Sequence, residues 1–271
     1  MSSATPSPNE PVDTARKPWP EIDCLTADAA VRMPNQVGWY PGVKVALDYA
    51  AAILLLPCVV ILVGMAALAV KLTSSGPVFY SQTRIGLNGR RYKIFKIRTM
   101  HYNCEMRSGI KWSQKGDNRI TRVGNFLRIT HIDELPQLLN VLWGEMSLVG
   151  PRPERPEVIQ AKGLDQLVPG YKHRLLVKPG VTGLAQVQLP ADTDITSVRY
   201  KVVYDLYYVQ NPNLLLDLRL LLATVFKSVG VGARLLRWLF LLPSQRTIAA
   251  VFQSSVRVAT ESDSRTALLP A

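Results

Sequence analysis

A run of 22 residues without a charged side chain, from Tyr49 to Val70, constrains this chain more than any other feature. As an α-helix the run would be roughly 33 Å long, which is about the thickness of the hydrocarbon core of a bilayer. It lies well inside the chain and lacks the pattern of a signal peptide. A buried core helix is the alternative, but such helices seldom run this far without a polar residue. The sequence therefore predicts a membrane-inserted helix, which we assign to residues 43–72.

Pro57 lies inside this predicted helix and removes one of its backbone hydrogen bonds. Membrane helices tolerate proline, and a mild kink is the simpler consequence. A break that turns the chain back to the face it entered is the other interpretation. Taken alone, the residues favour a simple span.

Positive charge is concentrated just after the apolar run. The formal net charge is +12, and residues 84–128 hold twelve Lys or Arg against two acids, Glu105 and Asp117. This position fits the cytoplasmic side of a membrane and contact with anionic lipid headgroups. Nucleic-acid binding also fits a basic chain, but no helix-turn-helix, zinc-finger or RNA-recognition pattern accompanies the charge. We therefore expect lipid headgroups or a phosphorylated substrate as the anionic partner, and no nucleic acid.

The chain divides into four parts. We expect a flexible proline-rich tail over residues 1–42, the membrane helix over 43–72, a domain on the cytoplasmic face over 73–230, and an interfacial helix with a polar tail over 231–271. The three cysteines and three histidines are scattered, so neither a disulfide framework nor a zinc site is predicted. His131 is expected to be an ordinary loop residue.

Residues 78–100 are typical of a β-hairpin, because two extended segments flank Asn88-Gly89, a tight-turn signal. Ile94 and Ile97 are expected to be buried. The second strand also carries three basic side chains, Lys93, Lys96 and Arg98. These either form a solvated face or face lipid headgroups and a substrate phosphate.

Two adjacent carboxylates, Asp133 and Glu134, stand at the start of a predicted helix that ends at Gly144. Its apolar stripe has the spacing i, i+3, i+4, i+7 and consists of Leu135, Leu138, Leu139 and Leu142. Asp133 suits the N-cap, and acidic residues there are favourable with the helix dipole. Neighbouring residues on a helix point about 100° apart, so the two carboxylates would do different jobs. Spacing alone leaves helix capping ahead of catalysis.

Arginines bracket this acid pair at Arg128 and Arg152. Arg152 stands between Pro151 and Pro153, which restrict the backbone on both sides and present the guanidinium from a stiff segment. A planar fork held in this way suits bidentate binding of a phosphate, although a surface turn is the simpler alternative. Further on, residues 178–183 read KPGVTG, a turn that would either cradle a nucleotide or join two strands.

Four ordered blocks closely resemble the bacterial sugar transferase family. They are LTSSGPVFYSQTRIGLNGRRYKIFKIRTM, DNRITRVGNFLRITHIDELPQLLNVLWGEMSLVGPRPE, KPGVTGLAQV and an ending that reads YDLYYVQN and then LDLRLLLATV. This family comprises the polyprenyl-phosphate sugar-1-phosphate transferases, also called monotopic phosphoglycosyl transferases. The resemblance runs from about Val43 to about Gly230. It implies a small mixed α/β domain on the cytoplasmic face, with an N-terminal re-entrant helix and interfacial amphipathic helices.

The resemblance also implies roles for residues. Asp133 would attack the β-phosphate of a UDP-sugar, expel UMP and pass the sugar-1-phosphate to a polyprenyl phosphate, normally undecaprenyl phosphate. Magnesium is implied as the cofactor, with Glu134 and Asp133 as its ligands, and Glu134 would assist with the metal or the proton. The implied substrate-binding residues are Arg128, Arg152, Pro151, Pro153, Lys96, Arg98, Lys178 and Thr182.

The implied setting is the bacterial inner membrane, with its lipid as a partner and a homodimer as a further possibility. The activity would begin the assembly of a surface polysaccharide or exopolysaccharide. Two alternatives remain open from the residues. One is a non-enzymatic, membrane-tethered basic protein that binds anionic lipid or nucleic acid. The other is a hydrolase that cleaves UDP-sugars with water as the acceptor.

Overall fold

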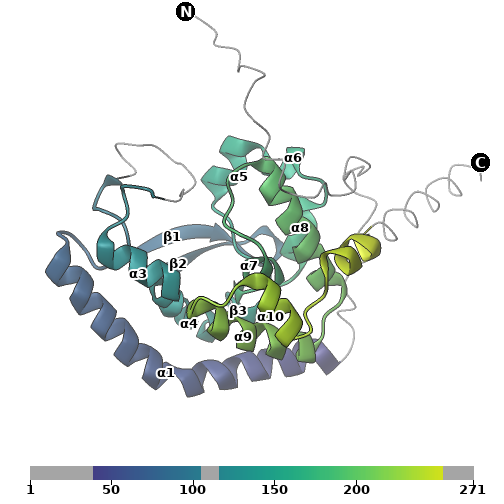
Figure 1. Cartoon of the computed structure of the whole chain (residues 1–271), viewed down its shortest axis with the longest axis horizontal. Coiled ribbons are helices and arrows are strands. Elements are labelled where there is room, and N and C mark those ends of the chain that lie inside the picture. Colours follow the sequence, from purple (N-terminus) through teal and green to yellow (C-terminus); the bar gives the residue numbers. More distant parts are fainter. Residues whose placement is uncertain (1–38, 105–115, 253–271) are drawn as a thin grey trace, which may run out of the picture.

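The computed structural model describes residues 39–104 and 116–252, which form a mixed α/β structure with small sheets (Figure 1). The tail predicted for residues 1–42 lies outside the described residues except for its last four, and so does the polar end of the chain beyond residue 252.

The apolar run lies in helix α1, Trp39–Thr73, which contains Pro57 and begins four residues before the predicted segment. The helix runs along one side of the molecule and bends near its middle (Figure 1), as a proline inside a helix would cause. In the described part of the chain it is the one helix long and apolar enough to cross a membrane, and only 11% of its most apolar stretch is buried. That exposure does not fit a buried core helix and indicates membrane association.

Both halves of α1 nevertheless contact the rest of the protein. In the first half, Ala52 is fully buried in the main hydrophobic core. In the second half, Ala66 and Val70 pack with Ile97 and Leu127 in a separate small cluster. The helix therefore lies against the domain along much of its length.

The predicted hairpin is confirmed. Strands β1, Phe79–Ile85, and β2, Arg91–Ile97, pair antiparallel, with Ile85 opposite Arg91. The turn is longer than a two-residue turn, because a 3-10 segment, Leu87–Gly89, separates the strands. Asn88 and Gly89 both have positive φ, 53° and 76°, which explains why this residue pair occupies the turn.

A second, parallel pair joins β3, Ser147–Val149, to β4, Gly180–Thr182. The backbones come so close that a Cβ on Gly180 would collide with the main chain of Gly150. The Gly150 amide donates to the Thr182 carbonyl at 2.9 Å. Residues 180–182 are therefore a strand themselves, and the prediction that residues 178–183 form a turn joining two strands is wrong. The alternative, that this segment cradles a nucleotide, stays a prediction.

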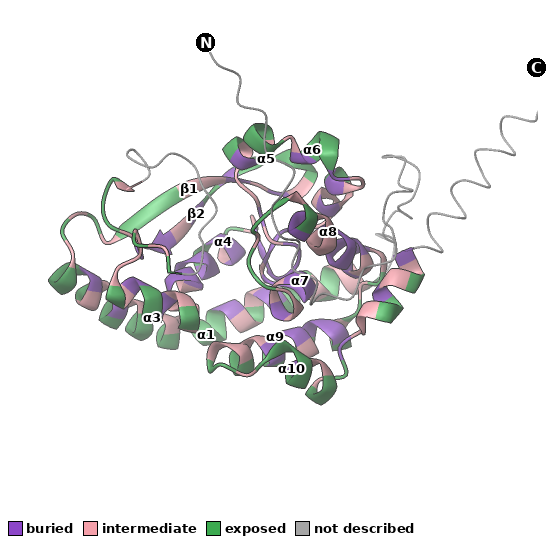
Figure 2. Ribbon diagram, turned by 45° about the horizontal axis from the view of Figure 1, so that its top comes forward, coloured by how far each residue is buried: buried purple, intermediate pink, exposed green. Residues whose placement is uncertain are grey.

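Helices surround these strands. The longest in the domain is α8, Ile195–Gln210, which buries Val202, Val203 and Leu206 in the main core (Figure 2). The other elements after β2 are α3 (Arg122–Thr130), η2 (Ile132–Gln137), α4 (Leu138–Leu142), α5 (Pro156–Lys162), α6 (Leu164–Leu167), η3 (Tyr171–Leu176), α7 (Leu184–Gln188), α9 (Leu214–Ser228) and α10 (Ala233–Leu239).

Exposed apolar side chains are not confined to α1. Helix α9 exposes Leu215, Leu218, Leu222, Val225 and Phe226, and α10 exposes Leu235, Trp238 and Leu239. Helices α1, α9 and α10 lie along the same side of the molecule (Figures 1 and 2). Near the other end of α1, the short helix α3 exposes Phe126 and Ile129.

Candidate active site

The acid pair lies in η2, a 3-10 turn that follows α3 through His131. His131 has φ 58°, an uncommon conformation for a residue with a side chain, and reverses the chain between the two elements. The prediction that Asp133 is the N-cap is wrong, because Asp133 lies inside the turn and His131 precedes it. The turn is 3-10 and contains Pro136, whose ring would clash with the carbonyl four residues back in an α-helix.

The apolar stripe predicted for this helix holds only in part. Leu138 is buried, but Leu139 is exposed, and Val141 takes a buried position instead. The change from 3-10 to α geometry rotates the face that meets the core. The predicted end is confirmed, since Gly144 has φ 76° and follows the last turn of α4.

Glu134 is held between two cations. Its Oε1 accepts hydrogen bonds from Lys96 Nζ at 2.6 Å and from Arg152 Nη2 at 2.8 Å, and its Oε2 accepts a longer one from Arg152 Nη1 at 3.3 Å. Burial alone would raise the pKa of the Glu134 carboxyl, but the charges and hydrogen bonds of Arg152 and Lys96 outweigh burial and hold it well below its usual value. Glu134 therefore stays ionised and suits holding cations rather than donating a proton.

Asp133 has a different environment although it is the next residue. Its side chain is buried, and no described residue forms a hydrogen bond or ion pair with its carboxylate. Burial, with the negative charge of Glu134, raises the pKa of Asp133 to about 6, against the opposing effect of Lys96, Arg128 and Arg152. The Asp133 carboxylate is therefore ionised at neutral pH. Cations surround it, but none of those described forms an ion pair with it.

Arg128 reaches the site from the last turn of α3. Its Nε donates to the Thr99 hydroxyl at 2.8 Å, just beyond the end of β2. The sequence prediction that Arg128 and Arg152 bracket the acid pair thus agrees with the geometry.

The segment that carries Arg152 is held by its three carbonyl groups. Pro151 O accepts from the Gly180 amide at 2.9 Å, Arg152 O from Arg174 at 2.8 Å, and Pro153 O from Arg84 at 3.1 Å. Arg174 is itself fixed by a buried ion pair with Asp205 at 2.7 Å. The stiffness expected from the two prolines is reinforced by these bonds.

A cavity of about 590 Å³ opens beside the acid pair. Six of the predicted site residues line it, namely Lys96, Arg128, Asp133, Glu134, Arg152 and Thr182. The structure adds residues that sequence reasoning missed, among them Tyr80, Asp192, Lys201, Thr224 and Lys227. It also places His131 on the wall, where the sequence predicted only a loop residue. No pattern in the sequence links these positions, because they come from elements far apart in the chain.

The other predicted residues lie elsewhere. Arg98 donates to the carbonyls of Ser74 and Ser75 and so fixes the chain at the end of α1. The Lys178 ammonium lies close to Gly144, outside the cavity lining. Pro151 and Pro153 support Arg152 without lining the cavity.

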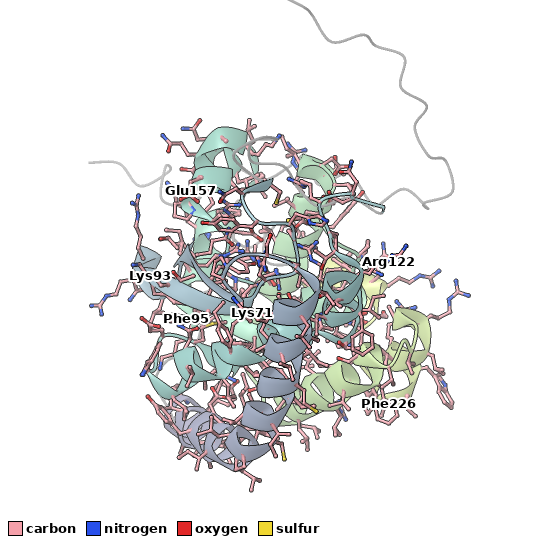
Figure 3. All side chains as sticks on the ribbon, turned by 90° about the vertical axis from the view of Figure 1, so that its left-hand side faces the viewer. Lys71, Lys93, Phe95, Arg122, Glu157 and Phe226 are labelled. Atoms are coloured by element: carbon pink, nitrogen blue, oxygen red, sulfur yellow. The ribbon has the colours of Figure 1, made fainter. Side chains whose placement is uncertain are left out.

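The sequence left open whether the basic side chains of β2 form a solvated face or point towards the site. The structure places them on both faces of the strand. Lys96 is buried at the site, whereas Lys93 is exposed and projects from the outer face (Figure 3).

A mixed α/β domain with an exposed apolar helix is typical of a membrane-associated protein, and a cavity that places Asp133 and Glu134 among cations suits phosphate groups. Comparison with known proteins identifies the family of this protein. The family model for bacterial sugar transferases matches residues 39–230, and the chain belongs to that family.

Three curated relatives are similar to this chain. One is a UDP-N-acetylgalactosamine-undecaprenyl-phosphate N-acetylgalactosaminephosphotransferase from Aeromonas hydrophila, 40% identical over 196 residues. Another is a UDP-glucose:undecaprenyl-phosphate glucose-1-phosphate transferase from Caulobacter vibrioides, 45% identical over 187 residues. The third is the exopolysaccharide production protein PSS from Rhizobium leguminosarum bv. phaseoli, 44% identical over 171 residues.

The matches cover 72%, 67% and 61% of this chain, respectively. They cover different shares of the relatives, 46% of the Aeromonas protein, 68% of the Caulobacter protein and 84% of the Rhizobium protein.

Proposed function

We propose that this protein transfers sugar-1-phosphate from a UDP-sugar to a polyprenyl phosphate such as undecaprenyl phosphate, through a covalent intermediate on Asp133. This reaction would begin the assembly of a surface polysaccharide or exopolysaccharide. The relatives support the substrate class, since two of them are named for transfer from a UDP-sugar to undecaprenyl phosphate.

The observation that carries the mechanism is the state of Asp133. A nucleophilic carboxylate must be ionised and free to approach phosphorus. Asp133 meets both conditions, because its pKa is about 6 and no described side chain binds it. Around it, Lys96, Arg128 and Arg152 supply the positive charge that phosphoryl transfer needs on the phosphate oxygens.

In the first step, a carboxylate oxygen of Asp133 attacks the phosphorus that bears the sugar. The bond between that phosphorus and the oxygen bridging to the α-phosphate breaks, and UMP leaves with the bridging oxygen and its electron pair. The enzyme then holds an acyl phosphate ester of the sugar. Arg152 suits the oxygens of this group, because its side chain is 35% exposed and Glu134 uses only part of its donor set.

In the second step, an oxygen of the polyprenyl phosphate attacks the same phosphorus. The bond to Asp133 breaks, the carboxylate is regenerated, and the product is a polyprenyl diphosphate sugar. Each step exchanges one phosphorus–oxygen bond for another, so no oxidant or reductant is required.

Magnesium fits this site as a shared ion. No group of three or more His, Cys, Asp or Glu suited to a metal occurs among the described residues. Mg²⁺ usually binds through one or two carboxylates together with substrate phosphates and water. Asp133 offers unpaired oxygens, and Glu134 Oε2 has only the 3.3 Å bond to Arg152. When bound there, the ion would neutralise charge on the diphosphate of the nucleotide sugar.

The side of the molecule formed by α1, α9 and α10 would contact the inner membrane at its cytoplasmic face. In this proposal α1 enters the bilayer and returns to the same face. The supporting observation is that Ala52 in its first half and Val70 in its second half both pack against the same domain.

The products separate the candidate activities. Purified protein in detergent is incubated with Mg²⁺ and a panel of UDP-sugars, with or without polyprenyl phosphate. The transferase produces UMP and a lipid-linked diphosphate sugar when the acceptor is present. Continuous release of free sugar-1-phosphate without acceptor would instead establish the hydrolase. No turnover of any UDP-sugar would favour the non-enzymatic lipid-binding alternative.

A further inference from the structure

Helix α9 presents a polar end and an apolar end to the same cavity. Its lining residues Leu221, Thr224, Val225, Lys227 and Ser228 share roughly one face, with the apolar members earlier and the polar members mainly in the last turn. Leu55 and Val59 of α1 line the cavity as well. The two helices that supply this apolar wall are also helices that expose apolar side chains to the outside.

Lys227 is a cation inside this cavity without a carboxylate partner among the residues described here. Its ammonium donates to the main-chain carbonyl of Gln186, a neutral acceptor. Burial lowers the pKa of Lys227 to about 8, and the neighbouring charges of Lys201 and Arg152 add to this effect. The nearby Lys201 differs, because it forms an ion pair with Asp192 at 2.9 Å.

A buried ammonium next to other cations is costly unless an anion joins it. The other cations of the cavity are placed differently. Lys96 and Arg152 bind Glu134, and Arg128 approaches Asp133 from α3. Lys227 instead approaches from the helix that carries the outward apolar stripe. A phosphate attached to a hydrocarbon chain would meet Lys227 as the chain follows the wall formed by α9 and α1.

We propose that Lys227 binds the phosphate of the lipid acceptor and positions it for attack on the phosphosugar at Asp133. This inference rests on the proposed function, since it assumes two phosphate-bearing substrates that visit one site in turn. The same ammonium chemistry would suit the diphosphate of the nucleotide sugar, so the test must separate the two half-reactions.

The test compares Lys227→Gln with the wild-type protein in two arms. The first arm measures UMP release in a single turnover without acceptor, and it should change by less than about twofold. The second arm measures transfer from the preformed adduct to polyprenyl phosphate. There the acceptor concentration for half-maximal rate should rise about tenfold or more, as expected for losing a charged hydrogen bond. Lys227→Arg should restore most of the loss.

Arg219→Gln is the matched control, because it removes a cation from the same helix outside the cavity lining. It should leave both arms near wild type. If Lys227→Gln slows UMP release as much as transfer, Lys227 serves the nucleotide and the inference is wrong. An unchanged acceptor dependence would overturn it as well.

A binding measurement keeps the inference separate from the proposed function. Farnesyl phosphate should bind the wild-type protein in detergent about tenfold more tightly than Lys227→Gln. Equal affinity would contradict a lipid-phosphate site at Lys227 whatever the turnover. Absence of any UMP release by the wild type would contradict the proposed reaction while leaving this comparison valid.

Discussion

Asp133 and Glu134 are neighbours in sequence with opposite electrostatic environments. Glu134 is neutralised by Lys96 and Arg152, whereas Asp133 is buried without a partner among the described residues. Environments that push the pKa values of two carboxyls apart commonly assign them different roles. In the proposed mechanism, the paired carboxylate of Glu134 holds the cations in place and the unpaired carboxylate of Asp133 is the nucleophile.

Replacing Asp133 with Asn should abolish turnover and stabilise the fold. The pKa of Asp133 is about 6 when folded, against an ordinary value of 3.8, so the folded protein binds this proton more tightly. The ionised carboxylate therefore lowers the free energy of unfolding above about pH 6, and the penalty disappears as the pH falls towards 3.8. Asn should raise that free energy by about 1–3 kcal/mol at pH 7.5, seen as a higher Tm in detergent.

Glu134→Gln is the contrasting variant. It leaves Lys96 buried without its carboxylate, which should lower the free energy of unfolding by about 3–5 kcal/mol. A Tm that falls with Asp133→Asn by as much as with Glu134→Gln would show that Asp133 forms stabilising contacts, contrary to this account.

The pH dependence of the first half-reaction follows from the same carboxyl. UMP release in a single turnover should fall about tenfold for each pH unit below pH 6, because only the ionised Asp133 attacks phosphorus. The measurement is a quenched-flow series from pH 4.5 to 8. A rate that stays constant down to pH 4.5 would exclude a nucleophile with this pKa.

The sequence identified this acid pair and its bracketing arginines but could not assign the two environments. That difference depends on Lys96 from β2 and on burial produced by the whole fold. Helix capping, which the spacing favoured, does not occur at Asp133, because the turn begins after His131 and Asp133 lies inside it.

At the scale of elements, a buried polar cluster joins α1 to the domain. Asp217 on α9 accepts hydrogen bonds from Tyr40 at 3.0 Å, Lys44 at 2.9 Å and Tyr208 at 2.7 Å. One turn beyond Lys44, Asp48 accepts a hydrogen bond from the Ser147 hydroxyl at the start of β3. The cluster ties the first half of α1 to the strand that leads into the Arg152 segment.

Asp217→Ala should release this half of α1. Tyr40, Lys44 and Tyr208 lose the charged acceptor that they share in a buried site, and Lys44 keeps only Asp48 as an ion-pair partner. The free energy of unfolding should therefore fall by about 3–5 kcal/mol. Limited proteolysis should then cut near residues 39–48 faster than in the wild type. Asp165→Ala, which removes an exposed acid from α6, serves as the control. Equal protease resistance in the two variants would show that the cluster does not hold the helix.

Prediction of the elements succeeded where the local signal was strong. The hairpin followed from Asn88-Gly89 and the apolar helix from its uncharged run. The pairing of β3 with β4 was not predicted as a sheet, because three-residue strands are too short for a periodic pattern and the partners are distant in sequence.

At the scale of the whole molecule, the apolar side and the cation-lined cavity meet at α1 and α9. The sequence predicted membrane association and a phosphate site separately. It could not predict that one cavity would join them, since its walls come from elements between Leu55 and Ser228. In the proposed function, this arrangement is what would bring a soluble nucleotide sugar and a lipid phosphate to the same carboxylate.

The proposed path of α1 makes a topological prediction. Its 35 residues correspond to roughly 52 Å of helix, yet both ends should lie on the cytoplasmic face. In a protein with its native cysteines replaced, Gly42→Cys and Ser75→Cys should each react with an impermeant maleimide in inverted membrane vesicles. Neither should react in intact spheroplasts. Labelling of one of the two from the outside would establish a spanning helix.

The central claim, a covalent intermediate on Asp133, is tested most directly by intact mass. The purified protein is mixed with Mg²⁺ and its UDP-sugar without lipid acceptor. The reaction is then quenched and the intact mass of the protein is measured by mass spectrometry. We predict a mass increase of one sugar phosphate that maps to the peptide containing Asp133, disappears when polyprenyl phosphate is added, and never forms in Asp133→Asn. Full product formation with no adduct on this peptide, or an adduct that persists in Asp133→Asn, would contradict the account.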